Sequence, residues 1–71
     1  MAKFEIEQGR KVFSCELALD KIIFDLEIVA DDFIYNESTA EAVKVAEYCA
    51  KLAGIKKQLA EMRRGWENGK N

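Results

Sequence analysis

The chain has 71 residues, 49% of them apolar, and a net charge of −2. One small domain of this length buries only about 60% of the surface that its unfolded chain exposes, so a monomer is marginally stable and oligomerisation is a common remedy. The apolar content is too high for a disordered protein. No apolar run approaches the roughly 18 residues of a membrane-spanning helix, and the N-terminus lacks a secretory h-region, so the sequence predicts a cytoplasmic protein without a membrane partner.

Two residue types limit the chemistry that the chain can perform. There is no histidine, the side chain whose pKa suits proton transfer near neutrality and the commonest nitrogen ligand of zinc. The two cysteines, Cys15 and Cys49, are too few for a disulfide scaffold and are expected to be small buried apolar residues. No nucleophile is accompanied by a base and an oxyanion hole, so we predict no enzyme, no catalytic residue, no metal and no cofactor.

Charge is divided between the two halves of the chain. Residues 1–41 hold ten acidic and four basic side chains, a net charge of −6, whereas residues 42–71 hold three acidic and seven basic ones, a net charge of +4. This asymmetry predicts either a basic helix packed on an acidic sheet or a surface that presents one sign of charge to a partner.

The pattern of residues 3–29 predicts a three-stranded antiparallel meander. Phe4 and Ile6 alternate with charged residues, and Gly9 can supply the positive φ of a tight hairpin turn. With a second turn near Leu19, both hairpins place their apolar residues on one face of the sheet.

A helix is the alternative for residues 19–30. Apolar side chains also recur there at helical spacing: Leu19, Ile22, Ile23, Leu26, Val29, Ala30 and Phe33. We prefer a strand, because helical winding would place Phe24 and Ile28 on the polar face and because β-branched residues fit a pleated sheet. A loop over residues 30–37 follows.

The second half of the chain predicts one long amphipathic helix over residues 38–66, with a frayed tail at 67–71. Ser38 followed by Glu41 has the S-x-x-E spacing of a capping box at the helix start. Gly54 lies mid-helix, where it predicts either a continuous or gently bent helix or a break into two. The apolar stripe of the helix has an unbroken 3-4-3-4-3-4 spacing: Val45, Tyr48, Leu52, Ile55, Leu59, Met62 and Trp66.

The predicted fold is therefore a single α+β domain over residues 1–71, with the element order βββα. A helix of residues 39–66 measures about 40 Å, longer than a narrow three-stranded sheet can cover. We therefore predict a homodimer through the distal half of the helix, with Trp66 as the anchor of the contact. The alternative is that the distal half folds back on its own chain. The predicted self-association residues are Ile55, Leu59, Met62 and Trp66.

The outer face of the predicted sheet and the following loop are acidic. Such a surface suits a basic, nucleic-acid-binding partner, and small phage proteins often block host proteins in this way. We therefore predict a non-enzymatic protein-binding module, a small phage or mobile-element accessory protein that binds and occludes a host protein. Solubility and protection of the sheet edge are the alternative explanation. The predicted partner-binding residues are Glu5, Glu7, Glu16, Asp25, Glu27, Asp31 and Asp32.

Two further functions are compatible with these residues. The first is a nucleic-acid-binding homodimer that uses the basic side chains of the helix, for which a solvated surface is the simpler interpretation. The second is a structural subunit or assembly chaperone of a larger particle. The candidate nucleic-acid contacts are Lys56, Lys57, Arg63 and Arg64.

Overall fold

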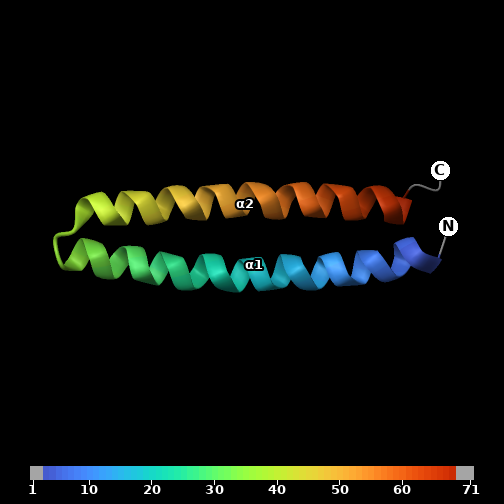
Figure 1. Ribbon diagram of the computed structural model, residues 1–71, viewed down its shortest axis with the longest axis horizontal. Coiled ribbons are helices and arrows are strands. Elements are labelled where there is room, and N and C mark those ends of the chain that lie inside the picture. The colour runs from blue at the N-terminus through green and yellow to red at the C-terminus, as the bar shows by residue number, and fades with distance from the viewer. Residues whose placement is uncertain (1–2, 69–71) are drawn as a thin grey trace.

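The chain forms a helical hairpin of two long antiparallel helices joined by a short turn (Figure 1). A computed structural model describes residues 3–68, with helix α1 at Lys3–Tyr35 and helix α2 at Thr39–Asn68. The helices lie side by side, with the turn at one end and both termini at the other. The molecule is 52 Å long, and its radius of gyration is 16.1 Å, against about 11 Å for a compact domain of this length. It is a rod made of a single layer of helices.

The predicted βββα fold is wrong, because no strand occurs between residues 3 and 68. Residues 3–29, predicted as a meander, lie within α1. The predicted loop, residues 30–37, is also helical as far as Tyr35. The helical alternative for the middle of this segment is therefore the correct one.

The prediction of a long helix in the second half of the chain is confirmed. Helix α2 is continuous through Gly54 and extends to Asn68, so it includes the first two residues of the predicted frayed tail. The rest of that tail, residues 69–71, lies outside the described residues.

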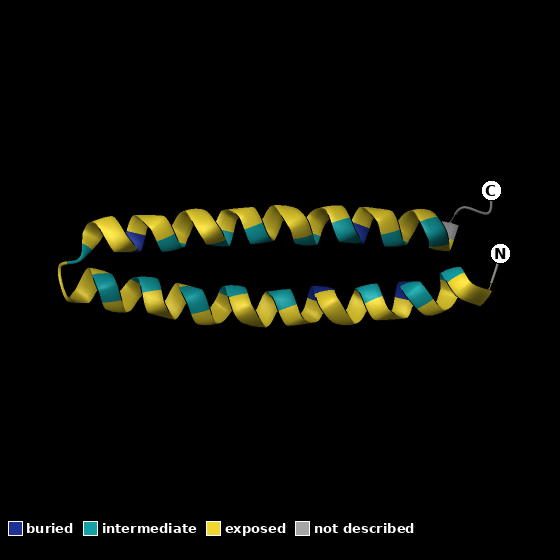
Figure 2. Cartoon of the chain, viewed as in Figure 1, coloured by how far each residue is buried: buried dark blue, intermediate teal, exposed yellow. Residues whose placement is uncertain are grey.

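Packing between the helices explains why α1 is helical despite its β-branched residues. The buried and half-buried residues of each helix include a set at alternating steps of three and four, which is the seven-residue repeat of a coiled coil. Figure 2 shows these residues on the facing sides of the two helices. We call the two sets the seam, and this tertiary contact outweighs strand propensity. The seam residues are Glu5, Gly9, Val12, Glu16, Leu19, Ile23, Leu26, Ala30 and Phe33 of α1 with Ala42, Val45, Cys49, Leu52, Lys56, Leu59, Arg63 and Trp66 of α2.

Gly9, and the apolar pair Phe24 and Ile28, favoured strands in the sequence, and the structure gives each a place within α1. Gly9 is buried in the seam, where an added Cβ would make an ordinary contact at 3.8 Å with Cγ of Arg63, so this glycine lies within α1 against α2 and forms no turn. Phe24 and Ile28 point outward, as helical winding requires, and are 61% and 47% exposed. Their exposure, which counted against a helix, is a real feature of the hairpin.

The turn ends α1 with a Schellman motif. The amide of Ser38 donates to the carbonyl oxygen of Phe33 at 2.7 Å, and the amide of Glu37 donates to that of Ile34 at 3.0 Å. Glu37 has a φ of 64°, in the left-handed region that glycine usually occupies at this position. The chain therefore reverses direction over only three residues, at the cost of local backbone strain.

Helix α2 starts where the capping signal predicted, with Ser38 as the N-cap residue. The carbonyl oxygen of Ser38 accepts a hydrogen bond from the amide of Ala42 at 3.1 Å. Glu41 forms an ion pair with Lys44 at 3.5 Å. The two side-chain hydrogen bonds of a capping box are not formed within residues 3–68, so only the backbone part of that prediction is confirmed.

Replacing Glu37 by glycine should stabilise the hairpin, because glycine adopts a positive φ without a steric penalty. We expect the Glu37→Gly variant to gain about 1 kcal/mol in free energy of unfolding, measured by urea denaturation at a fixed protein concentration. The matched control is Glu37→Ala, which removes the same carboxylate but keeps the strain and should gain much less. Equal effects of the two substitutions would contradict a strained turn.

Gly54 offers a second stabilising substitution. It lies within α2, and no atom would come within 4 Å of a Cβ added there. Alanine loses less backbone entropy than glycine on forming a helix, so Gly54→Ala should raise the free energy of unfolding by about 1 kcal/mol. Thermal and urea unfolding followed by circular dichroism would measure the gain, and a loss of stability would show that the site is more crowded than the structure indicates.

Candidate protein-binding surface

The seam divides the hairpin lengthwise into two sides, and one of them carries the polar links between α1 and α2. Three shallow hollows lie in a row along this side. Small residues of α2 line the hollow near the turn and the middle one, namely Ala46, Ala53 and Ala60. We call this the polar side.

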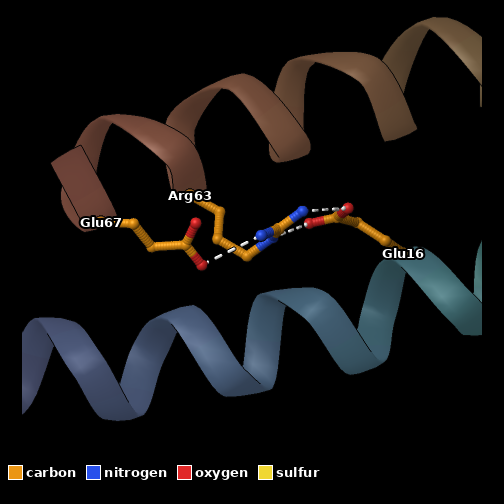
Figure 3. A network of polar contacts seen from close by, with 3 residues as sticks. All are labelled: Glu16, Arg63 and Glu67. Carbon is orange, nitrogen blue, oxygen red and sulfur yellow. Dashed lines mark hydrogen bonds and ion pairs between the residues drawn. The ribbon is translucent and has the colours of Figure 1, made fainter.

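Arg63 of α2 organises the polar side near the chain termini (Figure 3). Its Nε donates to Oε2 of Glu16 at 2.7 Å, and a second guanidinium nitrogen donates to Oε1 of the same carboxylate at 3.1 Å. A third donates to Glu67 at 3.0 Å, and the guanidinium lies 5.0 Å from the centre of the Phe13 ring. One arginine therefore joins α1 and α2 through a bidentate ion pair with Glu16 and a cation–π contact with Phe13.

Glu16 is the one charged residue that is buried within the described chain, with 4% of its surface exposed. A buried carboxylate must be paired to remain charged, and Arg63 supplies both hydrogen bonds. Hydrogen bonding to Arg63 holds the pKa of Glu16 below its ordinary value of 4.5, against the opposing effect of desolvation. The same pairing raises the pKa of Arg63.

A second ion pair joins the helices in the middle of the rod, where Nζ of Lys56 lies 3.0 Å from Oδ1 of Asp20. Together with the Glu16–Arg63 pair, it connects the acidic first half of the chain to the basic second half. The opposite charges of the two halves are thus satisfied in part within the molecule, but between two helices and not between a helix and the acidic sheet that the sequence predicted.

The other side of the seam is free of charged side chains over three helical repeats. Within each helix, residues of the seam alternate with residues that flank it on this side, which gives both helices a 3-4-3-4-3-4 spacing. Of these fourteen residues, only Trp66 lines a hollow of the polar side. We call them the apolar face: Val12, Cys15, Leu19, Ile22, Leu26, Val29 and Phe33 of α1 with Val45, Tyr48, Leu52, Ile55, Leu59, Met62 and Trp66 of α2.

Large side chains on the apolar face remain open to solvent. Ile22 and Ile55 are each 46% exposed, and Tyr48 is 52% exposed. The buried apolar residues of the described chain are Ala42 and Ala60, and no large side chain is fully buried. The hairpin therefore buries little of the apolar face by itself, and large exposed apolar patches are uncommon on monomeric proteins.

The four predicted self-association residues all belong to the apolar face. Ile55 and Met62 flank the seam and are 46% and 44% exposed, whereas Leu59 and Trp66 are half-buried in it. The missed part of the surface lies on α1, where residues 12–33 repeat the spacing of residues 45–66. Comparing the two spacings would have revealed the match from the sequence.

The seven predicted acidic residues do not form one face, because the sheet that would have gathered them does not exist. Glu16 is bound to Arg63, and Asp25 is paired with Lys21 at 2.9 Å. Glu16 also lines the middle hollow of the polar side, and three others line the remaining hollows: Glu5 near the termini, and Glu27 and Asp31 near the turn. Glu7 and Asp32 are exposed elsewhere on α1.

The four candidate nucleic-acid contacts are on the polar side or in the seam. Lys56 and Arg63 are committed to ion pairs with α1. Lys57 and Arg64 are exposed and line the middle hollow. Within residues 3–68, Lys57 and Arg64 form no ion pair, and they lie next to the carboxylates of Glu16 and Asp20.

Helix α1 also carries a second apolar row, which we call the outer row: Ile6, Phe13, Leu17, Phe24 and Ile28. These residues are between 47% and 61% exposed. Arg10 and Lys21 interrupt the row, so it lacks the charge-free continuity of the apolar face.

Both cysteines carry free thiols, and neither is fully buried as predicted. Cys15 is exposed on the apolar face. Cys49 is half-buried in the seam, with its Sγ 3.9 Å from the carbonyl oxygen of Ile23.

No group of three potential metal ligands occurs among residues 3–68, and neither helix contains a stretch apolar enough to cross a membrane. The chain matches no protein-family model, curated protein or solved structure. The chemistry of its own surface is therefore the basis for assigning a function.

Removing the Glu16 carboxylate should change how stability depends on pH. A lowered pKa in the folded state means that the carboxylate stabilises the hairpin above about pH 4.5 and loses this effect as the pH falls through the folded pKa. We expect Glu16→Gln to be less stable at pH 7 and to show a weaker decline in stability between pH 5 and 2, roughly the range of titration of such a group.

The control for this measurement is Glu67→Gln, which removes an exposed partner of Arg63 and keeps the buried one. Its acid unfolding should resemble that of the unmodified chain. If the free energy of unfolding declined equally steeply at acidic pH in the unmodified chain and in Glu16→Gln, the ion pair would not contribute to stability.

Proposed function

We propose that the chain is a non-enzymatic protein-binding module that packs its apolar face against helices of another chain. The single observation that carries this proposal is the charge-free surface of fourteen residues, continuous over both helices. Apolar surface removed from water contributes about 25 cal/mol per Å². Since the hairpin is only one layer thick, this gain becomes available when another protein covers the face.

The form of the surface supports helices as the binding element. Its side chains follow two parallel rows on each helix at the spacing of a coiled coil, and this spacing accepts the ridges of a further helix. The hairpin is a rod 52 Å long, which suits a partner that is also elongated. The expected product is a helical bundle.

A narrower prediction from the sequence is that the chain binds and occludes a host protein. This stays part of the proposal, but the predicted acidic residues are no longer proposed as the binding surface. The binding residues we now propose are those of the apolar face, and the proposed partner is a protein. A cytoplasmic location also stays part of the proposal, and the two free thiols are suited to the reducing environment of that compartment. Nucleic acid is a less suitable ligand, because Lys56 and Arg63 are neutralised by carboxylates of α1.

Site-specific photocrosslinking tests whether protein covers the apolar face. We expect p-benzoylphenylalanine in place of Tyr48 to form covalent protein adducts upon irradiation in cells that express the chain. The matched control replaces the neighbouring Glu47, which is exposed outside the seam and the apolar face, and should give few adducts. Adducts of equal yield at the two positions, or none at Tyr48, would refute the proposal.

Charge placed on the apolar face should abolish these adducts. Ile22 and Ile55 are half exposed in the hairpin, so the double variant Ile22→Lys with Ile55→Lys should keep its helical content and lose partner binding. The control variant Glu47→Lys with Ala50→Lys adds the same number of lysines on exposed positions outside the face. Helical content is followed by circular dichroism, and undiminished crosslinking in the first variant would contradict the assignment.

A further inference from the structure

We infer that the partner of the apolar face is a second copy of this chain, in a symmetric four-helix bundle that has both turns at the same end. In this arrangement, α1 of each copy lies against α2 of the other. The inference rests on the proposed function, and it adds the identity of the partner and the orientation of the contact. Three independent observations support it.

The first observation is the amount of surface that the hairpin exposes. The chain has a solvent-accessible area of 5329 Å², whereas a compact monomer of 8.1 kDa exposes about 4,500 Å². The excess is about 800 Å², which is the area that each partner buries in an interface of standard size. Contact with one further chain would therefore reduce the exposed area of each chain to that of a compact monomer of the same mass.

The second observation is that the apolar face is complementary to itself. Its two halves, residues 12–33 and 45–66, have the same length and the same 3-4-3-4-3-4 spacing. They run alongside one another in opposite directions, since Arg63 contacts Glu16 and Cys49 contacts Ile23 across the seam. A twofold axis can therefore bring the α1 half of one copy onto the α2 half of the other with their repeats in step, as an isologous interface requires.

The third observation is the charge along the two borders of the face, which selects the orientation. In the half of the face nearest the turn, exposed acidic side chains border it on α1, at Asp25 and Asp32, and exposed basic side chains border it on α2, at Lys44 and Lys51. Asp25 and Lys44 also form ion pairs within their own helices, and near the termini the basic Lys11 takes the equivalent position on α1. With both turns at the same end, the acidic border of each α1 lies along the basic border of the partner's α2. With the turns at opposite ends, each α1 instead faces the α1 of the other copy.

The charges of the whole helices favour the same orientation. Helix α1 carries eight acidic and four basic side chains, and α2 carries four acidic and six basic ones. The same-end bundle surrounds each acidic helix with two basic helices, whereas the opposite-end bundle places acidic helices next to each other. Like charges brought together at an interface oppose association, so the same-end bundle is the one we propose.

Distance measurement between spin labels at the turn tests both the partner and the orientation. The label is attached to Glu37→Cys in a chain that also carries Cys15→Ala and Cys49→Ala. We expect light scattering to give twice the mass of 8.1 kDa and double electron–electron resonance to give a distance well below half the 52 Å length of the rod. A label at Glu47→Cys, about one third of the way along α2, is the control that reports a nearby second copy in either orientation.

Each outcome separates the inference from the proposed function. A dimer with turn labels separated by roughly the length of the rod would overturn the same-end orientation. A monomer at high micromolar concentration that still forms an adduct with a different protein at Tyr48 would overturn the second copy and leave the proposed function in place. A monomer without such adducts would overturn both.

Charge reversal provides a check that does not depend on labels. Reversing Asp32 with Asp32→Lys should place like charges along both symmetry-related borders and weaken the dimer by roughly tenfold in Kd, the scale expected for two exposed ion pairs. Adding Lys44→Glu in the same chain should restore most of the affinity. An affinity that is unchanged in the single variant, or not restored in the double one, would contradict the proposed border contacts.

Discussion

Two helices that meet along one seam can each bury only one side, and this constraint governs the structure of the protein. A coiled-coil seam covers a narrow stripe on each helix, whereas α1 has apolar residues on most of its circumference. The result is a rod in which apolar side chains as large as phenylalanine and isoleucine stay exposed. Whatever this protein binds, the need to cover that surface is built into the architecture.

The two edges of the seam differ in chemistry, and the difference decides which side is available for binding. On the polar side, the buried Glu16 holds Arg63, Gly9 lies against the arginine stem, and Lys56 is paired with Asp20. These contacts satisfy the charges that the hairpin buries and leave only shallow hollows. On the other side, leucine, isoleucine, valine and aromatic residues follow one another without a charge, so that side is completed only by another apolar surface.

The same asymmetry links stability to binding. Few of the apolar side chains are fully buried in the single hairpin, and a chain of this length is marginally stable as a monomer. Covering the apolar face would therefore stabilise the fold and form the complex in one step, as in other proteins whose folding is coupled to association. The strained residue Glu37 is a local cost that such a complex would readily offset.

The amino-acid sequence by itself determined helix α2, its start at Ser38, its apolar stripe and the opposite charges of the two halves, because these depend on spacing and composition within one segment. The identity of α1 as a helix was decided by tertiary structure. Its β-branched residues satisfy strand and helix patterns alike, and only contact with α2 distinguishes them. Gly9 shows the same limit: a glycine that could form a turn instead lies against the stem of Arg63, a residue 54 positions away. The sequence carries the same spacing in residues 12–33 and 45–66, but only the antiparallel packing places these two apolar rows side by side on one face.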